Sequence, residues 1–259
     1  MSTNPIGIFD SGAGGLSIWK EINALLPTES TLYISDSKYA PYGPKGKEFI
    51  LNRAIINTEW LIDKGAKLIV VACNTATTNA ISYLRNHYDV PFIGIEPAIK
   101  PAALTSTNNT IGILATKGTL SSSLFHKTSE RYAQHITVVE QVGEGIVELI
   151  EAGKLYSDEM KHLLLNFLNP MLEQQIDCLV LGCTHYHFLT PILKKLLPNE
   201  VRIIDSGAAV ARQTKAILDQ NTILNTSREA AFYEFFSSGA KDVMASILDC
   251  ETSKIIQMP

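Results

Sequence analysis

The sequence has little excess charge of either sign. Lys and Arg make up 22 of its 259 residues and Asp and Glu 26, which gives a formal net charge of −4. Nucleic-acid-binding domains usually carry a basic patch, so this balance argues against a nucleic-acid partner. Hydrophobic residues make up 46% of the chain and charged residues 19%, which excludes a disordered protein. We expect one large folded domain or two smaller ones.

Long apolar runs are also missing. The longest, residues 68–73 and 178–181, fall far short of the roughly 20 residues that a membrane-spanning helix needs. The first residues (MSTNPIG) have no basic or long apolar stretch, so we expect no signal peptide. A cytoplasmic protein without membrane contact is predicted. Its four cysteines should then be reduced, and should serve as core residues, metal ligands or catalytic thiols.

Short apolar runs alternate with longer amphipathic stretches, which predicts an α/β fold with mostly parallel sheets. Several runs are apolar on both sides, as strands covered by helices on both faces are. Pro27 and Pro198 end two of the helical stretches. The expected strands are residues 6–9, 31–35, 67–72, 91–95, 110–115, 135–139, 178–182 and 201–205, and the expected helices are 15–26, 47–64, 78–87, 121–133, 157–174 and 189–197.

Three landmarks recur in one order at nearly one spacing. Residues 6–12 resemble residues 111–117, Cys73 is matched by Cys183, and Glu96 is matched by Asp205, at offsets of 105, 110 and 109 residues. Ordinary α/β repetition does not explain a cysteine followed by polar residues in both copies. The repeat therefore predicts two similar α/β domains related by pseudo-two-fold symmetry, with the active site in the cleft between them.

One cysteine in each half follows a predicted strand, where ligands of open α/β sheets bind. Asn74, Thr75 and Thr184 suit helix N-caps, so both thiols should lie near helix starts, which favour thiolates. Two opposed thiols can invert a stereocentre, because one removes a proton from one face and the other returns a proton to the opposite face. We predict Cys73 and Cys183 as these acid–base groups.

Other polar residues at the strand ends complete the predicted site. Asp10 and His185 are expected to tune one thiol each. The side chains expected to hold and polarise a substrate carboxylate are those of Ser11, Asn74, Thr75, Thr116, Thr119 and Thr184. Asp10 could instead cap the helix that follows it.

The remaining cysteines and histidines have simpler interpretations. Cys178 lies within a predicted strand and Cys250 on the apolar face of a terminal helical pattern, so both are interpreted as core residues. Cys178, Cys183, His185 and His187 together could suggest zinc, but their spacing lacks a tight Cys-x₂₋₄-Cys pair, and no metal is predicted. His187 is interpreted as a surface or supporting residue.

The glycine-rich residues 10–15 (DSGAGG) do not complete a dinucleotide-binding motif, because Ser17 stands where a third glycine belongs. They predict a tight turn that lets a small carboxylate approach the backbone. Tyr42, in residues 41–43 (PYG), could close over the crevice or simply form part of a β-turn.

Five motifs together resemble the glutamate racemases of the aspartate/glutamate racemase superfamily. They occur in the family's order and cover nearly the whole chain. His185 points to the glutamate branch, since aspartate racemases tend to carry Glu there. The motifs are residues 7–15 (GIFDSGAGG), 41–43 (PYG), 72–75 (ACNT), 181–185 (LGCTH) and 204–209 (IDSGAA).

The resemblance implies a homodimer that interconverts L- and D-glutamate without pyridoxal phosphate, another cofactor or a metal, and that supplies D-glutamate for peptidoglycan. It implies a first domain of residues 1–97 plus 208–259 and a second of residues 98–207. By motif position Cys73 and Cys183 are the acid–base residues. Those that bind substrate or tune the thiols are Asp10, Ser11, Pro41, Tyr42, Gly43, Asn74, Thr75, Thr116, Thr119, Glu151, Thr184 and His185.

One segment departs from the family pattern. Gly143, Glu144 and Glu148 stand where the family usually has Cys-Pro and a further proline. Glu148 lies one helical turn before Glu151, which leaves open which carboxylate reaches the cleft. The first motif starts close to residue 1, so we also expect no activation by a cell-wall precursor, because activated members tend to carry an N-terminal extension.

Two other functions remain open at this stage. The chain could racemise another small acid, such as aspartate or a hydantoin, or bind an amino acid without catalysis. A dinucleotide-dependent dehydrogenase is disfavoured by Ser17.

Overall fold

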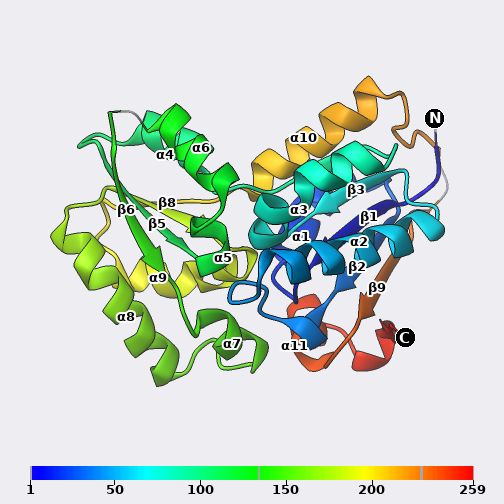
Figure 1. Ribbon diagram of the computed structural model, residues 1–259. Helices are drawn as coiled ribbons and strands as arrows, with labels where there is room; N and C mark the ends of the chain where they lie inside the picture. Colours follow the sequence, from blue (N-terminus) through cyan, green and yellow to red (C-terminus); the bar gives the residue numbers. More distant parts are fainter. Residues whose placement is uncertain (1, 134, 228–229, 259) are drawn as a thin grey trace.

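The computed structural model describes residues 2–133, 135–227 and 230–258, and in this part of the chain the strands form two parallel sheets (Figure 1). The six-stranded sheet has the order β10-β9-β2-β1-β3-β4 and the four-stranded sheet the order β6-β5-β7-β8. The strands are β1 (Ile6–Asp10), β2 (Thr31–Ser35), β3 (Leu68–Val71), β4 (Phe92–Gly94), β5 (Thr110–Ala115), β6 (Thr137–Val142), β7 (Cys178–Gly182), β8 (Arg202–Ile204), β9 (Tyr233–Ser237) and β10 (Ile255–Gln257).

Helices cover both faces of each sheet (Figure 1). The α-helices are α1 (Leu16–Leu25), α2 (Lys47–Asp63), α3 (Asn74–His87), α4 (Ile99–Thr105), α5 (Lys117–Leu120), α6 (Ser123–Tyr132), α7 (Ile146–Glu151), α8 (Asp158–Glu173), α9 (Thr190–Leu196), α10 (Gly207–Gln220) and α11 (Asp242–Leu248). Short 3₁₀ helices are η1 (Ser37–Tyr39), η2 (Thr184–Leu189) and η3 (Thr252–Lys254).

The central strands are buried on both sides, as their apolar sequences predict. Alternate residues of β3 pack on opposite faces of the larger sheet: Leu68 and Val70 belong to one core cluster, and Ile69 and Val71 to the other. The same alternation along β7 fills the two clusters of the smaller sheet. This double burial explains why the strands lack a polar face.

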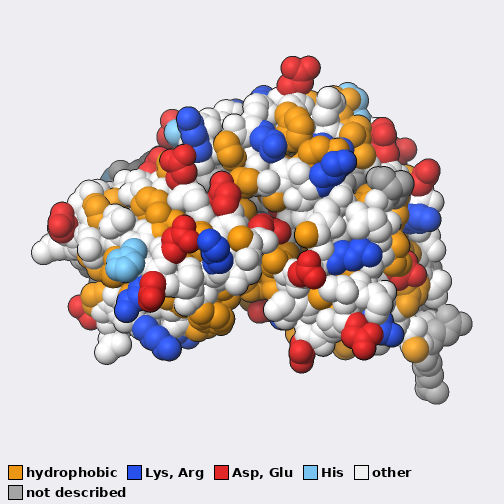
Figure 2. Space-filling model, turned by 90° about the horizontal axis from the view of Figure 1, so that it is seen from below, with side chains coloured by type: hydrophobic (Ala, Val, Ile, Leu, Met, Phe, Trp, Pro, Cys, Tyr) orange, Lys and Arg blue, Asp and Glu red, His pale blue; other side chains and the backbone are white. Residues whose placement is uncertain are grey.

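The two sheets repeat one strand order. The order β2-β1-β3-β4 in the larger sheet matches β6-β5-β7-β8 in the smaller one. The α/β fold with two similar halves is therefore confirmed. From below, the molecule has two lobes with a notch between them (Figure 2).

The chain passes between the sheets twice. It enters the smaller sheet between β4 and β5, and it returns after β8 through α10, which packs against α1. Strands β9 and β10 then join the larger sheet beside β2. The exact domain limits at residues 97/98 and 207/208 stay a prediction, and the outermost predicted residues, 1 and 259, lie outside the described part.

Several elements differ from the sequence-based expectation. Helix α3 begins at Asn74 rather than 78, because Cys73 itself occupies the N-cap position. The segment after Cys183 is the 3₁₀ helix η2, without a side-chain cap, so the expected helix start there was wrong. Helix α11 ends at Leu248, and the left-handed backbone of Asp249 (φ 52°) places Cys250 outside the helix, half-buried against the core.

No helix in the described ranges is both long enough and apolar enough to cross a membrane.

Candidate active site

The carboxyl ends of the two sheets meet at a narrow cavity of about 10 Å³. Both Cys73 and Cys183 line it, one from each sheet. Val147 of α7 is the one lining residue that was not predicted from the sequence. The others are Ser11, Pro41, Tyr42, Gly43, Asn74, Thr75, Thr116, Thr184 and His185. The three remaining predicted residues, Asp10, Thr119 and Glu151, lie behind this lining and contact it.

Cys73 is buried at the start of α3. Its Sγ accepts the N–H of Ala76 at 3.4 Å, and its thiol lies 3.6 Å from Ser11 Oγ. Burial raises the pKa of Cys73 well above its usual value, and the negative charge of Asp10 raises it further, although the Ala76 N–H and Ser11 oppose both effects. The surroundings therefore favour the protonated thiol of Cys73.

Asp10 is fully buried at the end of β1. One carboxylate oxygen accepts the N–H of Ser11 at 2.7 Å, and the other accepts the N–H of Gly15 at 2.6 Å and the hydroxyl of Thr184 at 3.2 Å. Burial raises the pKa of Asp10, while the charge of His185 opposes that rise. The Thr184 contact ties this carboxylate to the other half of the molecule.

His185 lies between Cys183 and Glu151. Its Nδ1 is 3.9 Å from Cys183 Sγ, and its Nε2 lies 2.6 Å from Glu151 Oε1 and 3.2 Å from the backbone nitrogen of Gly14, whose N–H points at it. Burial by itself lowers the pKa of His185, but the hydrogen bonds to Cys183 and Glu151 outweigh burial and raise it well above its usual value. For Glu151 the effects are reversed. Burial by itself raises the pKa of this carboxyl, but the hydrogen bond to His185 outweighs burial and lowers the pKa below its usual value. Both shifts favour a charged imidazolium–carboxylate pair behind Cys183.

Glu151, and not Glu148, contacts a residue that lines the cavity, namely His185. The Glu151 carboxylate also accepts the N–H of Ala13 at 2.7 Å, so it bridges α7 and the glycine-rich turn of the other half. Glu148 is exposed and lines an outer pocket next to the cavity. Of the two carboxylates, Glu151 is therefore the one that supports the cavity lining.

The glycine-rich turn packs directly against His185. A Cβ atom on Gly14 would lie 2.3 Å from His185 Nδ1 and 2.6 Å from its backbone nitrogen, so no side chain fits there. The turn does let carboxylates approach its backbone, as expected. The carboxylates bound there are the protein's own, Glu151 at Ala13 and Asp10 at Gly15.

Three threonine hydroxyls form a cluster between the two halves. Thr75 Oγ1 lies 2.8 Å from Thr116 Oγ1 and 3.3 Å from Thr119 Oγ1. Beside them, Asn74 is 2% exposed, and both polar atoms of its side chain lack a hydrogen-bond partner. Buried polar atoms are rarely left unpaired, so the Asn74 amide is available to a ligand in the cavity.

Tyr42 presents its ring to the cavity and its hydroxyl to a buried carboxylate that the sequence analysis missed. The Tyr42 hydroxyl donates to Asp36 at 2.5 Å, and Arg53 of α2 makes two hydrogen bonds of 2.8 Å to the same carboxylate. Burial and Asp36 raise the pKa of Tyr42 well above its usual value. Asp36 directly follows β2, and Asp10 is the last residue of β1, so the strand-end rule could have found Asp36, whereas no sequence signal marks Arg53.

His187 and Cys178 lie away from the cavity lining. His187 is largely buried, with its Nδ1 3.9 Å from Asp205, and burial lowers its pKa. Cys178 is buried within β7. In residues 2–133, 135–227 and 230–258, no group of three or more His, Cys, Asp or Glu side chains is placed so that it could hold a metal ion.

Comparison with known proteins gives a family match over most of the chain. Residues 6–214 match the model of the Asp/Glu/hydantoin racemase family. A glutamate racemase of Ectopseudomonas mendocina is 46% identical over 249 residues, which cover 96% of this chain and 94% of that protein.

Solved structures are similar over the whole fold. A glutamate racemase from Escherichia coli, in complex with L-glutamate and the activator UDP-MurNAc-ala, has a TM-score of 0.85 and 34% identity, covering 98% of this chain and 97% of that one. One from Francisella tularensis, in complex with D-glutamate, has a TM-score of 0.86 and 28% identity, covering 100% and 98%. The chain therefore belongs to the Asp/Glu/hydantoin racemase family and is an amino-acid racemase.

Proposed function

We propose that this protein interconverts L- and D-glutamate by a two-base mechanism that uses Cys73 and Cys183 and no cofactor. The observation that carries the proposal is that the two thiols line one small cavity from different sheets. The choice of glutamate is supported by the 46% identical relative and by the two similar structures that hold L- and D-glutamate.

The two thiols take different roles in this mechanism. Burial beside Asp10 raises the pKa of the Cys73 thiol, so Cys73 serves as the acid. Cys183, whose Sγ lies 3.9 Å from His185 Nδ1, serves as the base. The Cys183 thiolate takes the α-proton, so the Cα–H bond breaks, an S–H bond forms and the electron pair remains on the substrate as a carbanion. Cys73 then gives its proton to the opposite face of Cα and becomes the thiolate. The reverse reaction exchanges these roles.

The carbanion also needs stabilisation, because proton transfer by positioned groups typically supplies only about 10²–10⁴-fold. Hydrogen-bond donors aimed at the carboxylate on which negative charge develops can supply the rest. Asn74, with its two unpaired polar atoms, is the donor that the geometry favours most. Ser11, Thr75 and Thr184 line the same cavity and would hold the remaining substrate oxygens.

Circular dichroism with L-glutamate and no added cofactor tests the activity. The signal should decay to zero with the wild-type enzyme. Cys73→Ser and Cys183→Ser should each abolish the decay, because a serine hydroxyl is too weak an acid to replace either thiol. Cys250→Ser, a half-buried cysteine outside the cavity, is the matched control and should stay active. A fully active Cys73→Ser or Cys183→Ser enzyme would rule out the two-base mechanism.

The same assay separates the other functions. Faster turnover of L-aspartate than of L-glutamate would favour a different substrate. Glutamate binding without exchange of the α-hydrogen would favour a non-catalytic binding protein. Activity that is lost with a chelator and restored by zinc would favour metal catalysis.

The biological setting is part of the proposal. D-Glutamate made by this reaction would be supplied to peptidoglycan synthesis in the cytoplasm, by an enzyme that works as a homodimer without a nucleic-acid partner. These points rest on the family resemblance and on the net charge of −4. Depletion of the protein in its host should be rescued by external D-glutamate, and light scattering should give twice the mass of one chain.

A further inference from the structure

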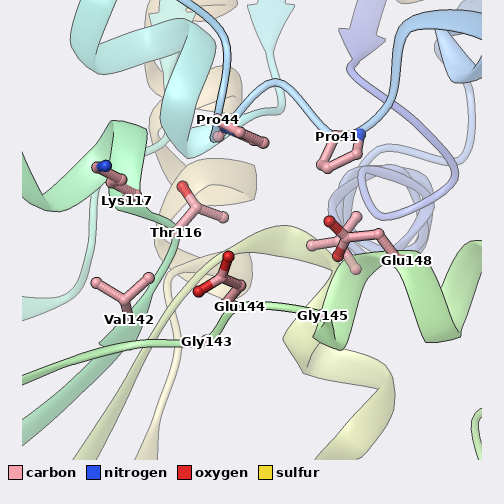
Figure 3. A pocket seen from close by; sticks show the side chains of 11 residues that line it. Pro41, Pro44, Thr116, Lys117, Val142, Gly143, Glu144, Gly145 and Glu148 are labelled. Atoms are coloured by element: carbon pink, nitrogen blue, oxygen red, sulfur yellow. The ribbon is translucent and has the colours of Figure 1, made fainter.

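An outer pocket adjoins the active-site cavity (Figure 3). Its volume is about 140 Å³, and it shares four lining residues with the cavity, namely Pro41, Gly43, Thr116 and Val147. In Figure 3 the Pro41–Pro44 loop lies on one side and the turn from Val142 to Gly145 on the other. Because the cavity itself is narrow and its lining is buried, a substrate reaches it through this outer pocket.

Charged side chains gather in the outer pocket and are almost absent from the cavity. Lys117, Glu144 and Glu148 line the outer pocket and are exposed. The carboxylate of Glu144 lies between the two sides of the pocket (Figure 3). Among the described residues that line the cavity, none is a lysine or an arginine. Among the described residues that line the outer pocket, Lys117 is the lysine, and it directly follows the cavity residue Thr116 in sequence.

Lys117 also lines a second surface hollow on the other side of the Gly43–Pro44 loop. This groove has a volume of about 430 Å³, and Lys45 and Lys47 line it with Lys117. None of the described residues that line it is acidic. The N-termini of α2 and α6 open into the same groove, and the partial positive charge of a helix N-terminus adds to that of the lysines.

The charge of the substrate gives this arrangement a role. Glutamate carries two carboxylates and one ammonium group, so its net charge is −1, and the chain as a whole carries −4. The electrostatic field of the whole protein therefore repels the substrate at long range. A local positive region near the cavity is needed to raise the substrate concentration there. We propose that Lys45, Lys47 and Lys117, in the groove beside the entrance of the cavity, form a capture surface for the dicarboxylate substrate, and that Glu144 and Glu148 in the outer pocket oppose its attraction. This inference rests on the proposed function.

The test compares kcat/KM at low and high salt. For the wild-type enzyme, kcat/KM should fall when KCl is raised from about 10 mM to about 300 mM, because salt shortens the range of the field. The combined variant Lys45→Gln, Lys47→Gln and Lys117→Gln should lose about five-fold in kcat/KM at low salt. The loss is modest because each lysine attracts the substrate only weakly through water. Its kcat should stay within about two-fold, and its salt dependence should nearly vanish.

A second variant carries the opposite prediction. Glu144→Gln combined with Glu148→Gln should raise kcat/KM at low salt, because two repelling charges are removed. The matched control for the lysine variant is Lys64→Gln, Lys194→Gln and Lys215→Gln, three exposed lysines that line neither hollow and give the same change in net charge.

The outcomes separate the two proposals. Equal effects of the two lysine variants, or a wild-type kcat/KM that does not change with salt, would overturn the capture surface while leaving the racemase activity intact. A wild-type enzyme that does not racemise glutamate at any salt concentration would overturn the proposed function instead. All of the altered lysines are at least partly exposed, and far-UV circular dichroism checks that each variant folds.

Discussion

Cys73 and Cys183 follow equivalent strands of the two sheets, yet their surroundings differ in charge. Cys73 lies near the buried carboxylate of Asp10, whereas Cys183 lies near the imidazole of His185. Their positions were predicted from the repeated motif. Because the repeat places one cysteine in each half, the two thiols line the cavity from different sheets. The contrast between the two surroundings depends on the His185–Glu151 pair, and the sequence indicated Glu151 only through the family resemblance.

The difference between the thiols can be measured by alkylation. With iodoacetamide near pH 7, Cys73 should react several-fold more slowly than Cys183, because the thiolate is the nucleophile and burial beside Asp10 raises the pKa of Cys73. His185→Asn should slow the reaction of Cys183 and leave Cys73 little changed. Mass spectrometry of the cysteine peptides over time gives both rates. Faster modification of Cys73 in the wild-type protein would reverse the proposed assignment of the two protonation states.

The pH profile tests the His185–Glu151 pair. Because the pKa of His185 is raised, the imidazolium is present at neutral pH. The imidazolium is lost only as the pH rises through this raised pKa. Glu151→Gln removes the negative partner, so the pKa of His185 should fall and the alkaline limb of kcat/KM should move to lower pH. Glu148→Gln, an exposed residue on the same helix, is the control and should leave the limb in place. An unmoved limb in Glu151→Gln would show that another group controls it.

At the scale of elements, the loop after β2 is fixed by helix α2. Arg53 of α2 binds Asp36, and Asp36 binds Tyr42, whose ring forms part of the cavity wall. Arg53 also lies over the ring of Tyr39, with its guanidinium carbon 4.0 Å from the ring centre. This network could not be predicted from the sequence, because it depends on how α2 packs across the end of the sheet. We therefore assign Arg53 a positioning role.

Loss of Arg53 should affect both stability and substrate binding. Arg53→Met leaves the Asp36 carboxylate buried without its cation, and breaking such a pair costs about 3 kcal/mol. Urea unfolding should show this loss, and KM should rise more than kcat falls, because the loop forms the wall of the cavity. Arg53→Lys should restore part of both values, since lysine keeps the charge but not the paired hydrogen bonds. The exposed Arg212→Met should change neither. If Arg53→Met lowers the stability and leaves KM unchanged, Arg53 stabilises the fold but does not position the cavity wall.

At the scale of the whole molecule, the sequence predicted the fold and most of the cavity lining. The repeat of strand-end motifs identified Cys73 and Cys183, because the carboxyl ends of parallel strands meet at one edge of a sheet. Val147 was missed, because α7 is a short helix whose buried side gives no distinct signal. Strands β9 and β10 were missed because their places in the larger sheet depend on a return of the chain that no local pattern marks.

Substrate should stabilise the whole molecule, because both halves line the cavity. A ligand that binds only the folded state at 100 times its Kd adds about 2.7 kcal/mol to the free energy of unfolding. For a chain of this length such a gain raises Tm by roughly 5–10 °C. Calorimetry with L- or D-glutamate should show this rise, and glycine, which lacks the side-chain carboxylate, should produce little of it. Equal shifts with glycine would contradict specific recognition of the dicarboxylate.

The most direct test of the two-thiol mechanism is the isotope content of both enantiomers early in the reaction in D₂O. If the two thiols act on opposite faces of Cα, product formed from either L- or D-glutamate should carry deuterium from its first appearance, while the remaining substrate keeps hydrogen. Product that retains the original hydrogen, or early deuterium in both enantiomers alike, would mean that one base serves both faces and would contradict the account.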